Sequence, residues 1–266
     1  MQGIYEQRLC AFVDILGFGD LVQRSLDRPA LQEQIRQLLR EVVLACPVWE
    51  RNSPVDVIEA RLRQEDVPDP QGKAEQLVNE YAAAERGSSF SDCLVLSATL
   101  NDRAITGLVT SLLYLSGNLA ELGAYARGAV YLGQLCHEQD LCFGPSLINA
   151  YELERNKAVY PRIVFSPEAY EAVAQGNLTS LGPSAPYLRE DVDGQRFLDF
   201  LNQTALHFSW PSPADQMRVI RRELDRQFSF SKIPPRVREK LVWLAHYFNL
   251  VLEEPIVGID PLSAGA

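Results

Sequence analysis

Two aspartates lie beside apolar stretches of the kind that form buried strands. Asp14 interrupts the run AFVDIL at residues 11–16, and Asp92 precedes the run CLVL at residues 93–96. A buried carboxylate loses its hydration unless a cation or several hydrogen-bond donors replace it. If the two strands are neighbours in a sheet, both carboxylates can converge on divalent ions, which prefer oxygen ligands. The pair therefore predicts a metal site formed by Asp14 and Asp92.

Each aspartate also has a purely structural interpretation. Asp14 could cap the helix that follows it, because a side-chain oxygen at that position accepts hydrogen bonds from free backbone amides. Asp92 could stabilise a turn. These alternatives predict that the two carboxylates do not act together.

A glycine-rich turn follows the first aspartate, and it adds to the chemical interpretation. Without side chains, glycines let a backbone approach phosphate oxygens closely, and the amides at a helix start favour anions. An aspartate within a strand, a glycine turn and a second aspartate at a strand end together suit phosphoryl chemistry. The residues expected to contact phosphate are Leu16, Gly17, Phe18 and Gly19.

The elements that must position these residues alternate between strands and helices. Apolar runs predict strands, and apolar residues at helical spacing predict amphipathic helices. This order predicts an α/β (α+β) fold with a mixed sheet and flanking helices. The expected strands are 9–16, 93–96 after a turn that starts at Gly87, 125–132, a return strand at 136–143, and 162–165. The expected helices are 27–45, 104–122 and 144–157.

The pattern changes beyond residue 180, where Gly, Pro and Ser cluster before two further amphipathic segments at 216–228 and 236–252. We therefore expect a catalytic domain over residues 1–180 and a C-terminal helical appendage over 181–266 packed on it. Prolines and charges at 47–86 indicate an insertion in the first domain.

Composition narrows the class of partner. A net charge of −10 without a basic run argues against nucleic acid or anionic membrane. Five scattered cysteines favour a reducing cytosol, and three distant histidines argue against zinc. The polar N-terminus lacks a signal-peptide pattern, and the uncharged stretch 104–120 is expected to be a buried helix. These features predict a soluble cytoplasmic protein.

Four segments resemble the catalytic core of class III nucleotidyl cyclases. They are FVDILGF at 12–18, FSD at 90–92, RGAVYLG at 127–133 and FGPSLINA at 143–150. The similarity covers roughly the first two-thirds of the chain and implies a mostly antiparallel sheet with a ferredoxin-like, palm-like core. It places Asp14 on the first metal strand and Asp92 in a β-hairpin.

More closely, the chain is similar to the small pyrimidine cyclases of bacterial anti-phage signalling systems of Pycsar type. The segments that carry this similarity are SDCLVLS at 91–97, AYELE at 150–154, DVDG at 191–194 and WLAHYFN at 243–249. The resemblance implies an enzyme that converts UTP to 3′,5′-cyclic UMP and pyrophosphate. CTP, giving cyclic CMP, is the alternative substrate.

The resemblance also implies roles for individual residues. Asp14, Asp92 and the carbonyl of Ile15 would hold two Mg²⁺ or Mn²⁺ ions. Phe90 and Arg127 would contact the base, since an aromatic ring stacks on a pyrimidine and an arginine donates to its carbonyls. The family builds its site across a homodimer interface, and the cyclic product acts on a separate effector protein.

Departures from the purine cyclase pattern bear on substrate and catalysis. Ser88 replaces a lysine and Leu141 replaces an adenine-reading aspartate, which disfavours ATP. Glu152 stands where a transition-state arginine is usual, and Asn149 is shifted by one place. Arg127 or Arg155 could substitute for that arginine, although each could also be a structural or surface residue. Arg127 and Asn149 are the expected catalytic residues beside the two aspartates.

Two other classes of function stay open. A catalytically inactive nucleotide-binding sensor would keep the fold, and Glu152 in place of arginine favours it. A structural or partner-binding protein would use Asp14 only as a helix cap. Metal-dependent turnover separates the first class from an enzyme, and nucleotide binding by an Asp14→Asn variant separates the second.

Overall fold

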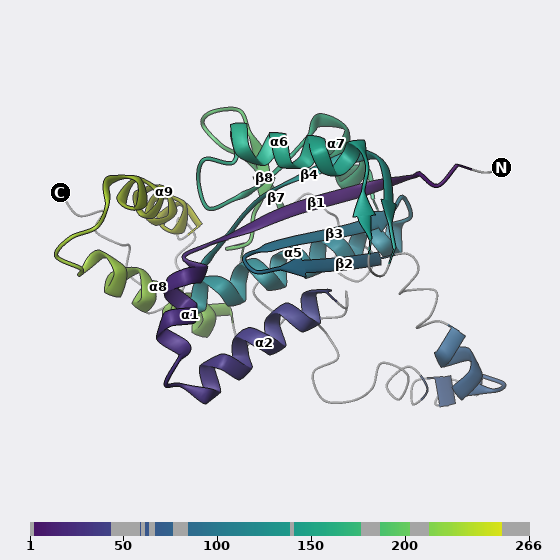
Figure 1. Cartoon of the computed structure of the whole chain (residues 1–266), viewed down its shortest axis with the longest axis horizontal. Helices are drawn as coiled ribbons and strands as arrows, with labels where there is room; N and C mark the ends of the chain where they lie inside the picture. The colour runs from purple at the N-terminus through teal and green to yellow at the C-terminus, as the bar shows by residue number, and fades with distance from the viewer. Residues whose placement is uncertain are drawn as a thin grey trace.

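A single mixed sheet organises the computed structural model (Figure 1). The strand order is β2-β3-β1-β4-β6-β8-β7, with β5 paired to β4 off this path. All pairs are antiparallel except β4 with β6. The prediction of a mixed, mostly antiparallel α/β fold is confirmed. The structure describes residues 3–43, 59, 62–63, 67–76, 85–138, 141–176, 187–202 and 213–251.

The strand that carries Asp14 lies at the centre of the sheet. This strand, β1 (Glu6–Leu16), pairs with β3 (Cys93–Thr99) on one side and β4 (Tyr125–His137) on the other. Side chains alternate between the two faces of a strand, so its odd-numbered residues share one face. Those residues, Leu9, Ala11, Val13 and Ile15, are all buried in the main core.

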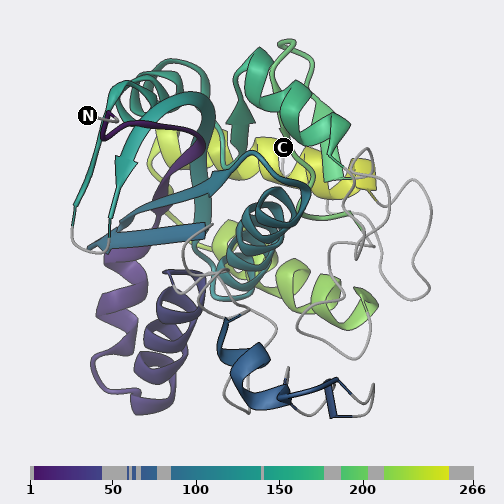
Figure 2. The ribbon, with the colours of Figure 1, turned by 90° about the vertical axis from the view of Figure 1, so that its right-hand side faces the viewer.

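Helices cover both faces of the sheet. On the odd-numbered face lies α5 (Asp102–Glu121), against which α2 (Pro29–Val43) and α8 (Pro213–Phe228) both pack (Figure 2). On the other face lies α6 (Pro145–Lys157). The edge contact of Phe12 in β1 with Tyr151 in α6, 5.4 Å between ring centroids, marks that second face. Asp14 shares the face of Phe12 and therefore points to the α6 side.

A hairpin of β2 (Glu85–Phe90) and β3 presents Asp92. The expectation of a turn starting at Gly87 is wrong, because Gly87 lies within β2. A Cβ at this glycine would lie 2.5 Å from the carbonyl oxygen of Val43, at the end of α2. β2 can lie this close to the end of α2 only because residue 87 has no side chain. Gly87 is therefore explained by the contact with α2 and not by a turn.

Two boundaries on the other side of the sheet differ from expectation. β4 continues to His137, because residues past 132 pair with the start of β1, Glu6 opposite Leu135. The return strand is therefore only β5 (Cys142–Phe143), which pairs with Cys136 and His137. β6 (Ile163–Phe165) follows α6 as expected and lies parallel to β4.

The C-terminal third contributes to the sheet as well as to the helices. β7 (Leu188–Glu190) and β8 (Arg196–Leu198) extend the sheet beyond β6, which the expectation of a helical appendage did not include. Apolar residues of α8 and of α9 (Pro235–Val251) belong to the same core cluster as β1. The remaining elements are α1 (Phe18–Ser25) and α7 (Pro167–Gln175).

Most of the expected insertion at 47–86 lies outside the described residues. Helix α5 begins at an Asn101 cap, whose side chain accepts from the amide of Ala104 at 2.9 Å. Among the described helices, none combines the length and the apolar character needed to span a membrane.

Candidate metal and phosphate site

Asp14 lies near the end of β1 between two polar cross-strand neighbours. Cys93 of β3 is opposite it on one side, and Arg127 of β4 on the other. Residues directly opposite in antiparallel strands share a face. All three side chains are therefore directed to the α6 side of the sheet, and all three are partly exposed.

Backbone geometry brings Asp92 to the same place. It follows Ser91, whose φ of 57° turns the chain between β2 and β3. The amide of Ile15 donates to the carbonyl of Asp92 at 2.8 Å, which ties the hairpin to the residue after Asp14. One ligand atom from each of Asp14, Asp92 and Cys93 lies within 4.8 Å of the others. The structure thus brings together the two carboxylates that sequence analysis paired.

The donor set fits a divalent cation. Two carboxylates offer the oxygen ligands that Mg²⁺ and Mn²⁺ prefer, and partial exposure leaves room for water or phosphate oxygens. Burial raises the pKa of the Cys93 thiol, and the nearby charges of Asp92 and Asp14 add to the rise. The two carboxylates are therefore better suited to bind a divalent cation than the thiol of Cys93. For Ile15, the structure establishes the amide contact to Asp92 but no role for its carbonyl.

The turn after Asp14 has the geometry of a helix start that can receive an anion. Gly17 takes the left-handed conformation, with φ 81° and ψ 7°, and its carbonyl accepts from Leu21 in the first turn of α1. The first amides of a helix lack intrahelical partners and attract anions. Leu16 and Phe18 pack against the core on either side, and Gly19 is exposed.

Asp14 does not cap this helix. The N-cap residue of α1 is Gly17, and no side chain makes the capping hydrogen bond. The carboxylate of Asp14 instead accepts from Arg127, at 2.6 Å between Oδ2 and Nη2. The structural interpretation of Asp14 as a helix cap is therefore wrong.

Arg127 contacts a second carboxylate, which sequence analysis missed. Its Nε lies 2.7 Å from Oε1 of Glu154 on α6. This contact is an ion pair without an aligned hydrogen bond, because both buried atoms lack a partner of hydrogen-bonding geometry among the described residues. Burial raises the pKa of Glu154; the charge of Arg127 opposes the rise and that of Asp14 adds to it. In the sequence, Glu154 stood out only as part of the segment 150–154 and by its spacing of four residues from Ala150 on the sheet-facing side of α6.

Lys240 of α9 is a further cation near this group. It is half-buried, and burial lowers its pKa most, followed by the charge of Arg127; Asp14 and Glu154 oppose that fall. Nothing in the sequence linked this position to Asp14, since the two residues lie near opposite ends of the chain. The site therefore combines two cationic side chains with three carboxylates.

Of the other expected residues, Phe90 lies beside this group, directly opposite Cys93 in the pairing of β2 with β3, and Asn149 lies on α6. Phe90, at the end of β2, exposes 85% of its surface, so its ring is not part of the core. Asn149 lies five residues before Glu154, which places it about 140° around α6 from Glu154 and about 100° from Ala150. Among the described contacts, none joins Asn149 to Asp14 or Arg127. Glu152 is exposed on the same helix.

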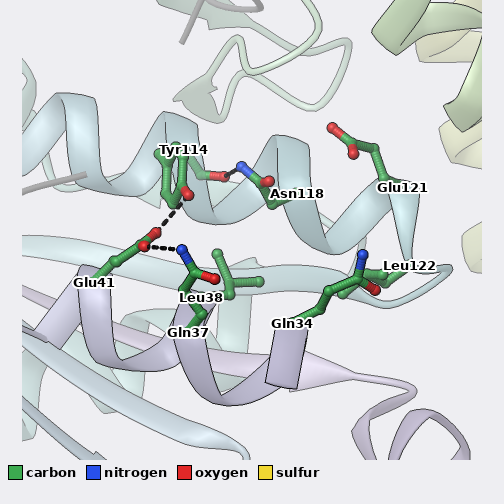
Figure 3. Close-up of a pocket in the computed structure, with 8 residues that line it drawn as sticks. All are labelled: Gln34, Gln37, Leu38, Glu41, Tyr114, Asn118, Glu121 and Leu122. Atoms are coloured by element: carbon green, nitrogen blue, oxygen red, sulfur yellow. Dashed lines mark hydrogen bonds between the residues drawn. The ribbon is translucent and has the colours of Figure 1, made fainter. Parts of the chain in front are cut away.

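Two cavities in the described part of the chain lie away from this site. One, of about 170 Å³, lies between α2 and α5, where Glu41 accepts from Tyr114 at 2.6 Å (Figure 3). The other, of about 490 Å³, lies between Tyr160 and α9, beside the parallel stack of Tyr160 on Trp243.

No protein-family model matches the chain, and no curated protein matches it. Function must therefore be argued from the geometry of the site and from the resemblance carried by its motifs.

Proposed function

We propose that this protein is a metal-dependent pyrimidine nucleotide cyclase that converts UTP to 3′,5′-cyclic UMP and pyrophosphate. The observation that carries the proposal is the convergence of Asp14 and Asp92, whose ligand atoms lie within 4.8 Å of each other. Asp14 lies three residues before Gly17, where α1 begins. A metal pair beside a phosphate-binding turn is the arrangement that phosphoryl transfer requires, because positioning and charge stabilisation dominate that chemistry.

In the reaction, the ribose 3′-oxygen forms a bond to the α-phosphorus while the bond to pyrophosphate breaks. Asp14 and Asp92 would hold the two ions, which when bound lower the pKa of the 3′-hydroxyl and neutralise the triphosphate. The amides at the start of α1 would receive phosphate oxygens. Arg127 and Lys240 add positive charge on the same side of the sheet. The exposed ring of Phe90 is free to contact a base.

The proposal includes a homodimer. Among the described residues, no contact joins Asn149 to Asp14 or Arg127, so the remaining base and ribose contacts would come from a partner subunit. A cytoplasmic location and a separate effector protein that responds to the cyclic nucleotide in anti-phage defence complete the proposal, on resemblance. Light scattering of the purified protein at several concentrations tests the dimer.

Incubation with Mn²⁺ or Mg²⁺ and each of the four nucleoside triphosphates tests the activity. Cyclic UMP, identified by mass, is the expected product, and cyclic CMP would assign the alternative substrate. The Asp14→Ala and Asp92→Ala variants are expected to lose at least about 100-fold of the rate. Absence of any cyclic nucleotide from the wild-type protein with either ion would sink the enzyme proposal.

A second candidate function is a catalytically inactive nucleotide sensor. Two observations favour it: Glu152 replaces the usual arginine, and Arg127 is paired with a metal-ligand candidate. Such a protein would bind UTP in equilibrium dialysis and return it unchanged after long incubation with Mn²⁺.

A further inference from the structure

Arg127 is shared unequally between two carboxylates. It donates an aligned hydrogen bond to Asp14, whereas its contact with Glu154 is a charge contact only. The Oε1 atom of Glu154 is buried and lacks a donor of suitable geometry among the described residues. A buried carboxylate oxygen without a donor is costly, so Glu154 gains if Arg127 turns fully towards it.

The bond to Asp14 conflicts with metal binding. A guanidinium already occupies one face of the carboxylate that must ligate a divalent ion, and like charges at contact distance repel strongly in a partly buried site. Arg127 contacts Oδ2 of Asp14, so an ion that takes this oxygen as its ligand displaces Arg127 from it. Glu154 lies within contact distance and can receive it, since the side chain already touches both partners.

Burial makes Glu154 a fixed receiver. Its side chain is 5% exposed, against 18% for Asp14 and 27% for Arg127. It sits on α6 and not on the sheet, so its position does not depend on the hairpin that carries Asp92. We infer that Glu154 is a positioning residue that draws Arg127 off Asp14 as divalent ions bind, so that Arg127 acts as an internal counter-ion that gates the metal site. This inference rests on the proposed metal site.

The test is Mn²⁺ affinity, measured by electron paramagnetic resonance of the free ion, with no nucleotide present. Arg127→Met removes the competing charge and should tighten Mn²⁺ binding by about tenfold or more. Arg127→Lys keeps the charge and should stay near wild type. Glu154→Gln removes the receiver and should weaken binding by about threefold or more. In the Arg127→Met, Glu154→Gln double variant, Mn²⁺ affinity should equal that of Arg127→Met alone, because Glu154 acts only through Arg127.

Arg36→Met is the matched control for net charge, since Arg36 is an exposed arginine on α2 paired with Glu33. It should leave Mn²⁺ affinity unchanged, and thermal unfolding of every variant establishes that it is folded. Wild-type affinity in Arg127→Met would overturn the gate while leaving the metal site intact. An equal effect of Glu154→Gln with and without Arg127 would show that Glu154 acts on the ion directly, which also overturns it. Failure of both wild type and Arg127→Met to bind Mn²⁺ would remove the metal site and the gate together.

Discussion

At the scale of single residues, the site is a balance of charges on one face of a central strand. Asp14 and Asp92 supply the negative charge, and Arg127 neutralises part of it through its bond to Asp14. Glu154 and Lys240 enter from α6 and α9, so helices distant in sequence adjust a site that the strands create. Substitutions at the carboxylates should therefore change ion affinity more than stability.

Replacing Asp92 by asparagine tests this separation. Asp92→Asn keeps the shape of the turn but removes one ionised ligand, so Mn²⁺ affinity should fall by about tenfold or more. The free energy of unfolding should change by less than about 1 kcal/mol, because the side chain is partly exposed. Calorimetric Mn²⁺ titration and urea unfolding measure the two quantities. Asp27→Asn, at an exposed position between α1 and α2, is the control, and equal Mn²⁺ affinity in both variants would contradict the ligand role.

At the scale of elements, apolar runs were sufficient for β1 and α5, helical spacing of apolar residues for α2, and the Gly144-Pro145 break for the start of α6. Such patterns were insufficient for β2, where Gly87 looks like a turn but allows close passage beside Val43. The Asp14–Asp92 pair could be predicted because each aspartate adjoins a strong strand signal. The role of Glu154 could not be predicted, because the sequence does not distinguish a buried glutamate from an exposed one. Only the structure shows that Glu154 is buried beside Arg127.

His137 joins three strands and should make stability depend on pH. Its ring nitrogens lie 3.0 Å from the Ser88 hydroxyl of β2 and 2.9 Å from the Ser97 hydroxyl of β3. Burial, then the charges of Arg8 and Arg86, lowers the pKa of His137 to about 4. The unfolded chain, with an ordinary histidine pKa of about 6.5, then binds the proton more readily.

The sign follows from that difference. The contribution of neutral His137 is complete above about pH 6.5 and is lost as pH falls towards about 4, by about 2 kcal/mol over the window. Urea unfolding at several pH values measures it. His137→Asn should flatten the curve in this window, whereas His246→Asn, at an exposed position on α9, should not. An unchanged curve in His137→Asn would contradict the assignment.

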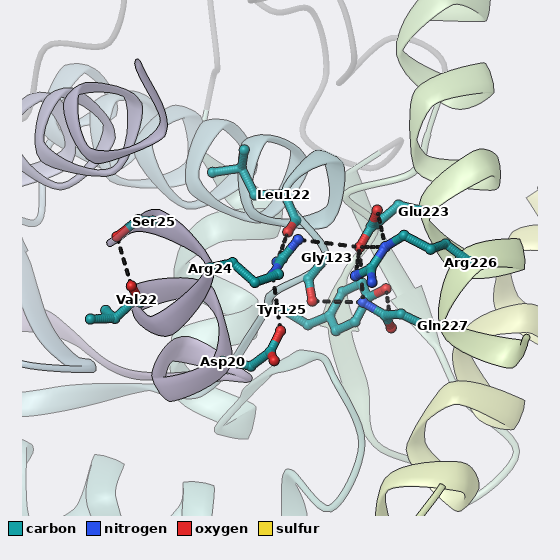
Figure 4. Close-up of polar contacts among 10 residues, drawn as sticks. All are labelled: Asp20, Val22, Arg24, Ser25, Leu122, Gly123, Tyr125, Glu223, Arg226 and Gln227. Carbon is teal, nitrogen blue, oxygen red and sulfur yellow. Dashed lines mark hydrogen bonds and ion pairs between the residues drawn. The ribbon is translucent and has the colours of Figure 1, made fainter. Parts of the chain in front are cut away.

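Helix α8 is tied to the turn between α5 and β4 by a buried amide. Gln227 donates to the carbonyl of Gly123 at 2.7 Å and accepts from the Tyr125 hydroxyl at 3.0 Å (Figure 4). Gln227→Ala removes both of these hydrogen bonds, and it should lower the free energy of unfolding by about 1–3 kcal/mol. Arg222→Ala, at an exposed position on α8, should change it by less than about 0.5 kcal/mol. Similar values for the two variants would argue against this contact.

At the scale of the whole molecule, one core unites the two parts that sequence analysis separated at residue 180. Leu224 of α8 and Phe248 of α9 are fully buried in the same cluster as Val13 of β1. Composition suggested a boundary because Gly, Pro and Ser mark loops, but loops alone do not reveal which surfaces they connect. The C-terminal third is therefore part of the structural support of the site.

A fragment of residues 1–180 should fail to fold independently. It would expose the face of α5 that contacts α8 and the sheet edge at β6 that β8 covers. We expect weak near-ultraviolet circular dichroism and no cooperative urea transition, in contrast to the full chain, which should unfold in one transition. Cooperative unfolding of the fragment would instead establish an independent N-terminal domain.

The main-chain bond from Ile15 to Asp92 has a consequence for engineering of the proposed metal site. Because amide and carbonyl groups fasten the strand end to the hairpin tip, the spacing of positions 14 and 92 belongs to the polypeptide backbone and should survive exchange of either side chain. New ligand atoms at positions 14, 92 and 93 should then change the selectivity between hard and soft cations while the backbone keeps its conformation.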